Sequence, residues 1–375
     1  MRFTHTEMSA DLRDATRKLL TREWSVDAAK RSAAGENDDA EKLWKHFASL
    51  GWPGIAAPSA YGGGSGSLLD LAAVAEEMGR AVAPTQLYST VVAAEVLGAF
   101  GTKDQKDAYL RTIVDGSLRA TVALDEPALT AQPDDVPVRA VRNGGWLLTG
   151  TRWFVAEAVS ADVILMAAAT SGGPALFIVP TQTDGLTLTP LATTSGPGQA
   201  VVTLSGVRIG EDQIVGSKGA GPAVLRRARE WAQCLQLADV VGVGAYVLEK
   251  TVAYVKQRIA FGVPIGSFQA VQHHLANMST ELDCAEMLAF EAIELVDRRD
   301  PAATIALARA QSFAPAAVKR ATLTAHQLHG GAGEVLEDDL YLYSNRAKRA
   351  ELTWGTPPEH LARVAEELAA EAGVS

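Results

Sequence analysis

Hydrophobic residues recur at intervals of three and four through most of the first 116 residues, with polar residues between them. This spacing is that of amphipathic helices, and Gly- and Pro-containing breaks separate the segments. The pattern predicts helices at Asp11–Trp24, Asp38–Leu50, Ser67–Val82, Ser89–Phe100 and Lys103–Asp115. We therefore expect residues 1–117 to form an N-terminal helical domain.

The pattern changes near residue 119 to short segments rich in Val, Leu, Ile and Thr, which Gly, Pro, Asn and Asp interrupt. Such segments are typical of a small antiparallel β domain. Strands are predicted at Leu118–Leu124, Val136–Val141, Gly145–Thr149, Val163–Ala169, Leu176–Val179, Leu186–Thr189 and Ala200–Val207. This middle domain is expected to occupy residues 118–215.

Helical spacing returns at Ala223 and continues almost to the end of the chain. Because long helices joined by short turns pack antiparallel, residues 216–375 are expected to form a C-terminal four-helix bundle. The bundle helices are predicted at Val224–Gln257, Ser267–Arg298, Pro301–Leu328 and Asp338–Lys348, and a last helix at Pro358–Ala370. The predicted fold class is therefore α+β and multidomain, in the order helical, β, helical.

Composition narrows the classes of function. The net charge is −10 with no block of Lys or Arg, which argues against nucleic acid or a membrane as a partner. No apolar run is long enough to span a bilayer, and the first residues lack the apolar region of a secretory signal. Cys234 and Cys284 lie in helical patterns with no metal-ligand spacing around them. These features predict a cytoplasmic protein without a metal site.

Residues 254–273 join two predicted helices. Gly262 and Pro264 interrupt the helical pattern there and form a corner. The planar fork of an arginine suits a phosphate, whereas aromatic rings and amides suit a nucleoside. The corner offers one cation, two rings and one amide: Arg258, Phe261, Phe268 and Gln269. On these residues alone, a plain helical hairpin in which Arg258 pairs with a nearby acid is the alternative.

A second segment, residues 326–333, reads His-Gln-Leu-His-Gly-Gly-Ala-Gly after a long Ala-rich helical pattern. Its glycines end the helix and let the backbone approach a ligand, and Gln327 lies one turn before them. The corner reads Arg-x-x-Phe-Gly-x-Pro-Ile-x-x-Phe-Gln, and the second segment reads Gln-x-x-Gly-Gly-x-Gly. Together they resemble the acyl-CoA dehydrogenase family of flavoproteins, and the resemblance covers nearly the whole chain.

The resemblance implies an oxidoreductase of lipid metabolism that uses FAD to convert a saturated acyl-CoA into the trans-2-enoyl thioester. A glutamate would remove the α proton while the β hydrogen leaves as hydride to FAD, and an electron-transfer flavoprotein or similar acceptor would take the electrons. In the family's oligomers, one subunit contributes contacts to the neighbouring subunit's FAD. By resemblance, the positions that contact its adenosine and diphosphate half are Arg258, Phe261, Phe268, Gln269, Gln327, Gly330 and Gly331.

The positions that contact the flavin ring depart from the family pattern. Relatives carry Thr-Glu-Pro-x-x-Gly-Ser-Asp where residues 125–132 read Asp-Glu-Pro-Ala-Leu-Thr-Ala-Gln. Asp125 would repel negative charge on a reduced flavin. Further on, Phe154 or Trp153 could stack on the flavin or belong to the β-domain core, and Ala156 replaces a hydroxyl residue.

The expected positions of the catalytic base also depart. One is Trp354, before Gly355-Thr356, and the other is Ala232, 26 residues before Arg258; neither side chain accepts a proton. Resident acids that could substitute are Asp239, Glu230 and Glu334. Asp239 is the best placed by helical spacing, although an acid bonded to a neighbouring side chain is the alternative for it.

Three hypotheses follow. In the first, the chain is the subunit of a heterotetramer that lends adenosine and diphosphate contacts to a related acyl-CoA dehydrogenase chain. In the second, it is a self-sufficient homotetramer with a relocated base. In the third, it is a non-catalytic scaffold that retains the fold. The acyl group stays unassigned in all three.

Overall fold

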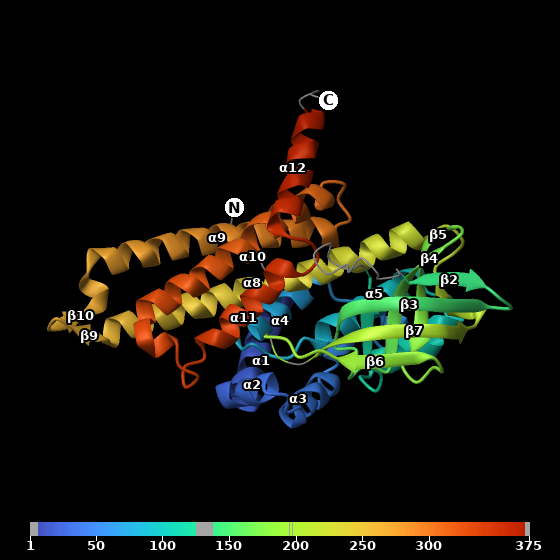
Figure 1. The fold of residues 1–375 in the computed structure, drawn as a ribbon, viewed down its shortest axis with the longest axis horizontal. Helices are drawn as coiled ribbons and strands as arrows, with labels where there is room; N and C mark the ends of the chain where they lie inside the picture. The colour runs from blue at the N-terminus through green and yellow to red at the C-terminus, as the bar shows by residue number, and fades with distance from the viewer. Residues whose placement is uncertain (1–6, 125–137, 195, 197, 372–375) are drawn as a thin grey trace. The chain divides into compact units, whose positions relative to one another are not determined.

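The computed structural model describes residues 7–124, 138–194, 196 and 198–371, and these form two compact units (Figure 1). Unit 1 contains the described residues of Met1–Ala33, Leu68–Ala83 and Gln233–Ser375. Unit 2 contains Ala34–Ser67 and the described residues of Pro84–Ala232. The N-terminal helical region thus contributes to both units, and the domain boundaries expected near residues 117 and 215 stay a prediction.

Unit 1 is helical. It contains the C-terminal part of α8 (Gly221–Gln257), and its α10 packs against α9, α11 and α12. Its other helices are α1 (Glu7–Glu23), α2 (Val26–Ala33), α4 (Leu68–Arg80), α9 (Gln269–Asp297), α10 (Ala303–His329), α11 (Leu340–Leu352) and α12 (Pro357–Glu371). A methyl group on Gly244 of α8 would lie 2.5 Å from Leu282 of α9 and 3.2 Å from Val318 of α10. The predicted bundle of α8, α9, α10 and α11 is therefore confirmed.

Helices α4 and α8 pack with their backbones in contact. A methyl group on Gly79 of α4 would lie 1.9 Å from the carbonyl oxygen of Asp239, and one on Gly242 of α8 would lie 1.9 Å from that of Glu76. No real Cβ atom tolerates such distances, so both positions require glycine for this packing.

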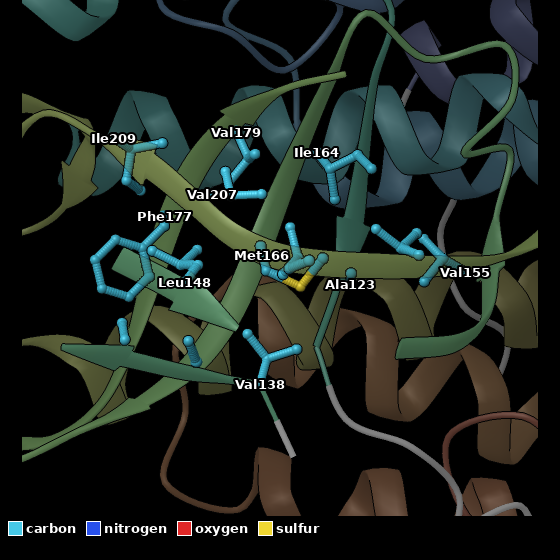
Figure 2. Close-up of a cluster of buried hydrophobic side chains, with 14 of the residues drawn as sticks. Ala123, Val138, Leu148, Val155, Ile164, Met166, Phe177, Val179, Val207 and Ile209 are labelled. Carbon is cyan, nitrogen blue, oxygen red and sulfur yellow. The ribbon is translucent and has the colours of Figure 1, made fainter. Parts of the chain in front are cut away.

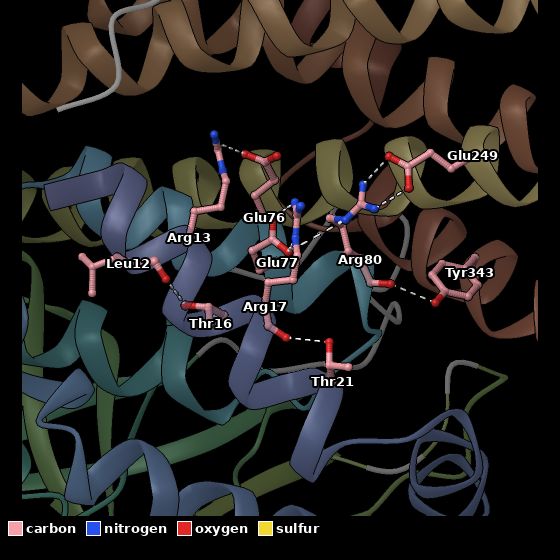
Figure 3. A network of polar contacts seen from close by, with 10 residues as sticks. All are labelled: Leu12, Arg13, Thr16, Arg17, Thr21, Glu76, Glu77, Arg80, Glu249 and Tyr343. Atoms are coloured by element: carbon pink, nitrogen blue, oxygen red, sulfur yellow. Dashed lines mark hydrogen bonds and ion pairs between the residues drawn. The ribbon is translucent and has the colours of Figure 1, made fainter. Parts of the chain in front are cut away.

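Ion pairs surround this helix crossing in unit 1 (Figure 3). Both oxygens of Glu77 on α4 accept hydrogen bonds from Arg17 of α1, at 2.8 and 2.6 Å. Arg80 of α4 donates two hydrogen bonds to Glu249 of α8, and its carbonyl oxygen accepts one from the Tyr343 hydroxyl at 2.9 Å. Helices α1, α4, α8 and α11 are thereby held together by directional contacts as well as by packing.

Unit 2 is built on an eight-stranded sheet with the order β6-β7-β3-β2-β4-β5-β8, and β1 also pairs with β4. The strands are β1 (Ala120–Ala123), β2 (Arg139–Arg142), β3 (Trp146–Ala156), β4 (Val163–Thr170), β5 (Gly173–Pro180), β6 (Leu186–Pro190), β7 (Gln199–Ile209) and β8 (Ile214–Val215). Its helical segments include α3 (Asp38–Ser49), α5 (Gln86–Phe100), α6 (Lys103–Gln105) and α7 (Arg111–Val114), with a π-helical turn at Lys106–Leu110 between the last two.

The sheet is mixed, which corrects the expectation of a purely antiparallel domain. Strands β1 and β2 both run parallel to β4, whereas the other pairs are antiparallel. Parallel neighbours require a long connection, and the hairpin of β2 and β3 lies within the connection from β1 to β4. One side of the sheet is covered by a core that includes Leu148, Ile164 and Phe177, each 0% exposed (Figure 2).

Helix α8 is long and apolar enough to cross a membrane by length and composition. However, 72% of its apolar window is buried inside the protein. Its apolar character therefore reflects a core helix.

We expect Gly242→Ala to lower the free energy of unfolding by about 1–3 kcal/mol, because the added methyl forces α4 and α8 apart. Thermal unfolding measures the change. Gly98→Ala in α5 is the matched control, since its added methyl would lie 3.5 Å from the nearest atom of Pro58. Equal unfolding midpoints for the two variants would contradict the backbone contact.

Candidate cofactor site

The corner after α8 is a short hairpin. Strands β9 (Ile259–Ala260) and β10 (Val263–Pro264) pair antiparallel, and Figure 1 shows them at one end of α8 and α9. Phe261 and Gly262 between them both have positive φ, +54° and +83°, as in type I′ hairpin turns. The predicted role of Gly262 in the corner is thus confirmed, and the positive φ of Phe261 is an additional feature.

The two rings of the corner are presented to solvent. Phe261 is 95% exposed, and its ring centroid lies 6.2 Å from that of Phe268 in an edge-to-face arrangement. A fully exposed phenylalanine in a left-handed conformation is costly by itself, so this placement suggests a ligand or partner that covers it.

Arg258 follows directly on α8 and is exposed. Its guanidinium forms no ion pair or hydrogen bond with any other residue that the structure describes, and the same holds for the exposed amides of Gln269 and Gln327. The interpretation in which Arg258 pairs with a nearby acid therefore has no support within the described ranges. These polar groups are available to a ligand.

The glycine turn after α10 leaves its backbone open. Gly330 has φ 58° and ψ −140°, a conformation that is essentially restricted to glycine. A methyl group on Gly330 or Gly331 would meet no atom within 4 Å. The far end of the turn is fixed by His326, whose Nδ1 lies 2.9 Å from the Gly333 carbonyl and whose Nε2 lies 2.7 Å from the Ser344 hydroxyl. A rigid backbone with open space over its glycines suits a diphosphate.

The corner and the glycine turn, about seventy residues apart in sequence, meet in space. The ring of Tyr254 stacks on the ring of His329, with centroids 4.1 Å apart and planes at 11°. The Tyr254 hydroxyl also donates a hydrogen bond to the His329 carbonyl at 3.2 Å. Because Arg258 lies one helical turn after Tyr254 and Gly330 directly follows His329, the structure brings the two predicted cofactor segments together.

In unit 2, Phe154 lies at a β-bulge of β3. The register between β3 and β7 shifts between Arg152 and Val155, so β3 carries one extra residue there. Phe154 has φ +54° and is 38% exposed, whereas its neighbour Val155 belongs to the sheet core. The geometry therefore favours a ring aimed outward over the alternative of a core residue. The departures at residues 125–132, Asp125 included, lie outside the described residues.

Both expected base positions lack an acid and have structural roles. Trp354 has φ +66°, and its carbonyl oxygen lies 3.0 Å from Nε2 of the buried His360. Thr356 directly precedes α12, and Glu359 accepts hydrogen bonds from the Thr356 amide and hydroxyl at 2.6 and 2.9 Å. This half of a capping box explains the Thr-Pro-Pro-Glu sequence without any catalytic role. Ala232 is 8% exposed within α8.

The three candidate acids differ in environment. Asp239 is buried, and Arg346 donates to its two oxygens at 2.9 and 2.5 Å, which supports a structural ion pair. Glu334 is exposed, with an oxygen 3.8 Å from Nδ1 of His326. Glu230 is half-buried in the unit 2 part of α8, and burial raises its pKa although Arg227 and Arg226 oppose the shift. The shift of the Glu230 pKa is in the direction that a general base needs.

Comparisons with known proteins identify the family of the chain. The family model described as acyl-CoA dehydrogenase, N-terminal domain, matches residues 6–117, and that of the C-terminal domain matches residues 219–369. The chain is 30% identical to acyl-CoA dehydrogenase FadE12 of Mycobacterium tuberculosis over 346 residues, which cover 88% of each protein.

Solved structures give the same result. The chain superimposes on a chain of the ChsE4–ChsE5 complex from Mycobacterium tuberculosis with a TM-score of 0.91 and 30% identity, over 98% of this chain and 99% of that chain. It also superimposes on a variant of the Tcur3481–Tcur3483 steroid ACAD with a TM-score of 0.88 and 31% identity, over 99% and 100% of the two chains.

These matches confirm the predicted architecture of a helical N-terminal part, a central β-sheet and a helical C-terminal part. The expected FAD cofactor and oxidoreductase class are those of the family that these models describe. The donor set of Arg258, the open glycine turn and the exposed rings fits such a cofactor. The chain belongs to the acyl-CoA dehydrogenase family of FAD-dependent enzymes.

Proposed function

We propose that this chain is one of two different subunits of a hetero-oligomeric acyl-CoA dehydrogenase, and that it lends adenosine and diphosphate contacts to the FAD of its partner. One observation carries the proposal. The exposed guanidinium of Arg258, free of described partners, adjoins an open glycine turn through the Tyr254–His329 stack, whereas the expected base positions hold Trp354 and Ala232.

The lending residues match the chemistry of a dinucleotide. The Arg258 fork would pair with the diphosphate, because no described acid competes for its guanidinium. The backbone at Gly330 and Gly331 would admit phosphate oxygens at close range, since no Cβ intervenes. The rings of Phe261 and Phe268 would cover the adenosine, and the amides of Gln269 and Gln327 offer both donors and acceptors to it. FAD supplies the hydride acceptor of the reaction when bound.

The proton-removing group would come from the partner. Proton abstraction next to a thioester carbonyl needs a carboxylate of raised pKa, and neither an indole nor a methyl group accepts a proton. Asp239 already binds Arg346 with both oxygens, so its use as a base would break a buried ion pair. The two similar solved structures are named after pairs of different chains, which supports the same type of assembly here.

A self-sufficient homotetramer is the second candidate, and one observation favours it. Glu230 is half-buried with a raised pKa, and its carboxylate forms no hydrogen bond within the described part of the chain. It could act as a relocated base. A scaffold without cofactor is disfavoured, because an exposed Arg258 without a described partner has no structural use in the absence of a ligand.

We infer an acyl-CoA substrate, an electron-transfer flavoprotein or similar protein as electron acceptor, and a cytoplasmic location. The family supports the first two, and the composition supports the third.

The main test is assembly. The chain expressed alone should bind little flavin and oxidise acyl-CoA slowly in a dye-reduction assay, because loss of positioned acid–base catalysis lowers rates by about 10²–10⁴. Activity should appear when the chain is co-expressed with a related chain. Full turnover from this chain alone, with one FAD per chain, would refute the proposal.

Arg258→Ala should weaken FAD binding by the assembled enzyme about ten- to hundredfold, because a charge-assisted contact to a phosphate is lost. Arg309→Ala on α10 is the matched control, since Arg309 is also exposed and the charge change is the same. FAD titration measures both. Equal affinities in the two variants would remove Arg258 from the site.

Asp239→Asn should leave kcat of the assembled enzyme nearly unchanged while it lowers thermal stability, because Arg346 loses its charged partner. Glu230→Gln should leave both nearly unchanged if the partner supplies the base. A loss of kcat of about 10²-fold or more in Glu230→Gln, with FAD still bound, would instead establish the homotetramer with a relocated base.

A further inference from the structure

One face of α8 packs against the segment from His329, at the end of α10, to Tyr343 in α11. Tyr246, Lys250 and Tyr254 are spaced by four residues and so lie on one face of the helix. The ring of Tyr246 stacks on Tyr343 at 4.5 Å and 13°, and its hydroxyl donates to Asp339 at 3.0 Å. The next step of this stripe after Tyr254 is Arg258.

Lys250 anchors the middle of the stripe. Its ammonium pairs with Asp338 at 2.9 Å and with Asp339, which is buried. Opposite charges this close and partly buried are screened little by solvent. The segment before α11 is therefore fixed to α8 one turn before Tyr254.

His329 is the contact of this segment that lies nearest to the glycine turn. It is 4% exposed, and neither ring nitrogen forms a hydrogen bond with a described residue. The nearest acid is Asp338, whose oxygen lies 3.9 Å from Nδ1. Because buried polar atoms without partners lower stability, hydrogen bonding by the ring nitrogens does not explain why a histidine lies here. What His329 does supply is a flat ring parallel to that of Tyr254.

We propose that the Tyr254–His329 stack is a positioning contact that sets the distance between Arg258 and the Gly330–Gly331 turn, and that it thereby controls FAD affinity. The inference rests on the proposed function. Tyr254 holds the last turn of α8 before Arg258, and His329 is the residue from which the glycine turn starts. The hydrogen bond from the Tyr254 hydroxyl to the His329 carbonyl fixes the backbone at the same point. Loss of either ring would let the cation and the glycine backbone separate, so that a diphosphate could not contact both.

The test measures the FAD Kd of the flavin-stripped assembled enzyme by fluorescence titration. Tyr254→Leu and His329→Leu should each raise Kd about two- to tenfold, which is what loss of an aromatic pair predicts. The double variant should bind no more weakly than the weaker single variant, because both changes break one contact. His329→Phe keeps both rings and the carbonyl acceptor and should bind FAD within about twofold of the parent. Tyr254→Phe keeps both rings but loses the hydroxyl, so it should raise Kd less than Tyr254→Leu does.

A control separates positioning from general stability. Phe290 is buried near the end of α9 that lies farther from Gln269, and Phe290→Leu should lower the unfolding midpoint without changing Kd. If the leucine variants at Tyr254 and His329 bind FAD like the parent while Arg258→Ala does not, the stack is merely structural and the inference fails. If Arg258→Ala also binds FAD normally, the proposed function fails with it.

Discussion

The contacts between one face of α8 and the segment from His329 to Tyr343 are those on which the site depends. Two ring stacks and the ion pairs of Lys250 lie at successive steps of four residues along the helix. The residues at the first three steps, Tyr246, Lys250 and Tyr254, all have partners in that segment. At the fourth step, Arg258 has no described partner and is exposed to solvent. Along this face, the polar groups of the first three steps have partners within the chain, and the guanidinium of Arg258 is the group that we propose for the ligand.

Compared with the family pattern, the chain keeps the residues expected to contact the adenosine and diphosphate of FAD but lacks an acid at the expected positions of the base. The groups suited to a dinucleotide lie on exposed backbone and side chains of unit 1. The two positions at which the resemblance places a catalytic base hold no acid, and Trp354 has a structural contact there, since its carbonyl oxygen lies 3.0 Å from Nε2 of His360. Asp239 gives the same result, because Arg346 already uses both of its carboxylate oxygens. An enzyme subunit that provides contacts to another chain would lose the second set and keep the first.

Much of the fold was predictable because its signals are local. Helix spacing located α8, α9 and α10 to within a few residues. Helix α2 was missed, because its eight residues carry too short an apolar pattern. Strand β3 extends to Ala156 beyond its predicted end, since Gly150 and the polar residues after it interrupt the alternation. The parallel pairing of β1 with β4 depends on a distant partner, which no local pattern contains.

The sequence predicted which residues belong to the candidate site, but not which contacts those residues make. The corner and the glycine turn follow from their sequences, but the stack of Tyr254 on His329 joins positions 75 residues apart. Likewise, only the fold reveals that Arg346 neutralises Asp239, 107 residues away, and that Phe154 lies at a bulge. The most direct test of the proposed subunit role is an experimental structure of the assembled holoenzyme. We expect the FAD diphosphate against Arg258 and Gly330, with the catalytic carboxylate on a different chain. A carboxylate of this chain, such as Glu230, against the acyl α carbon would contradict it.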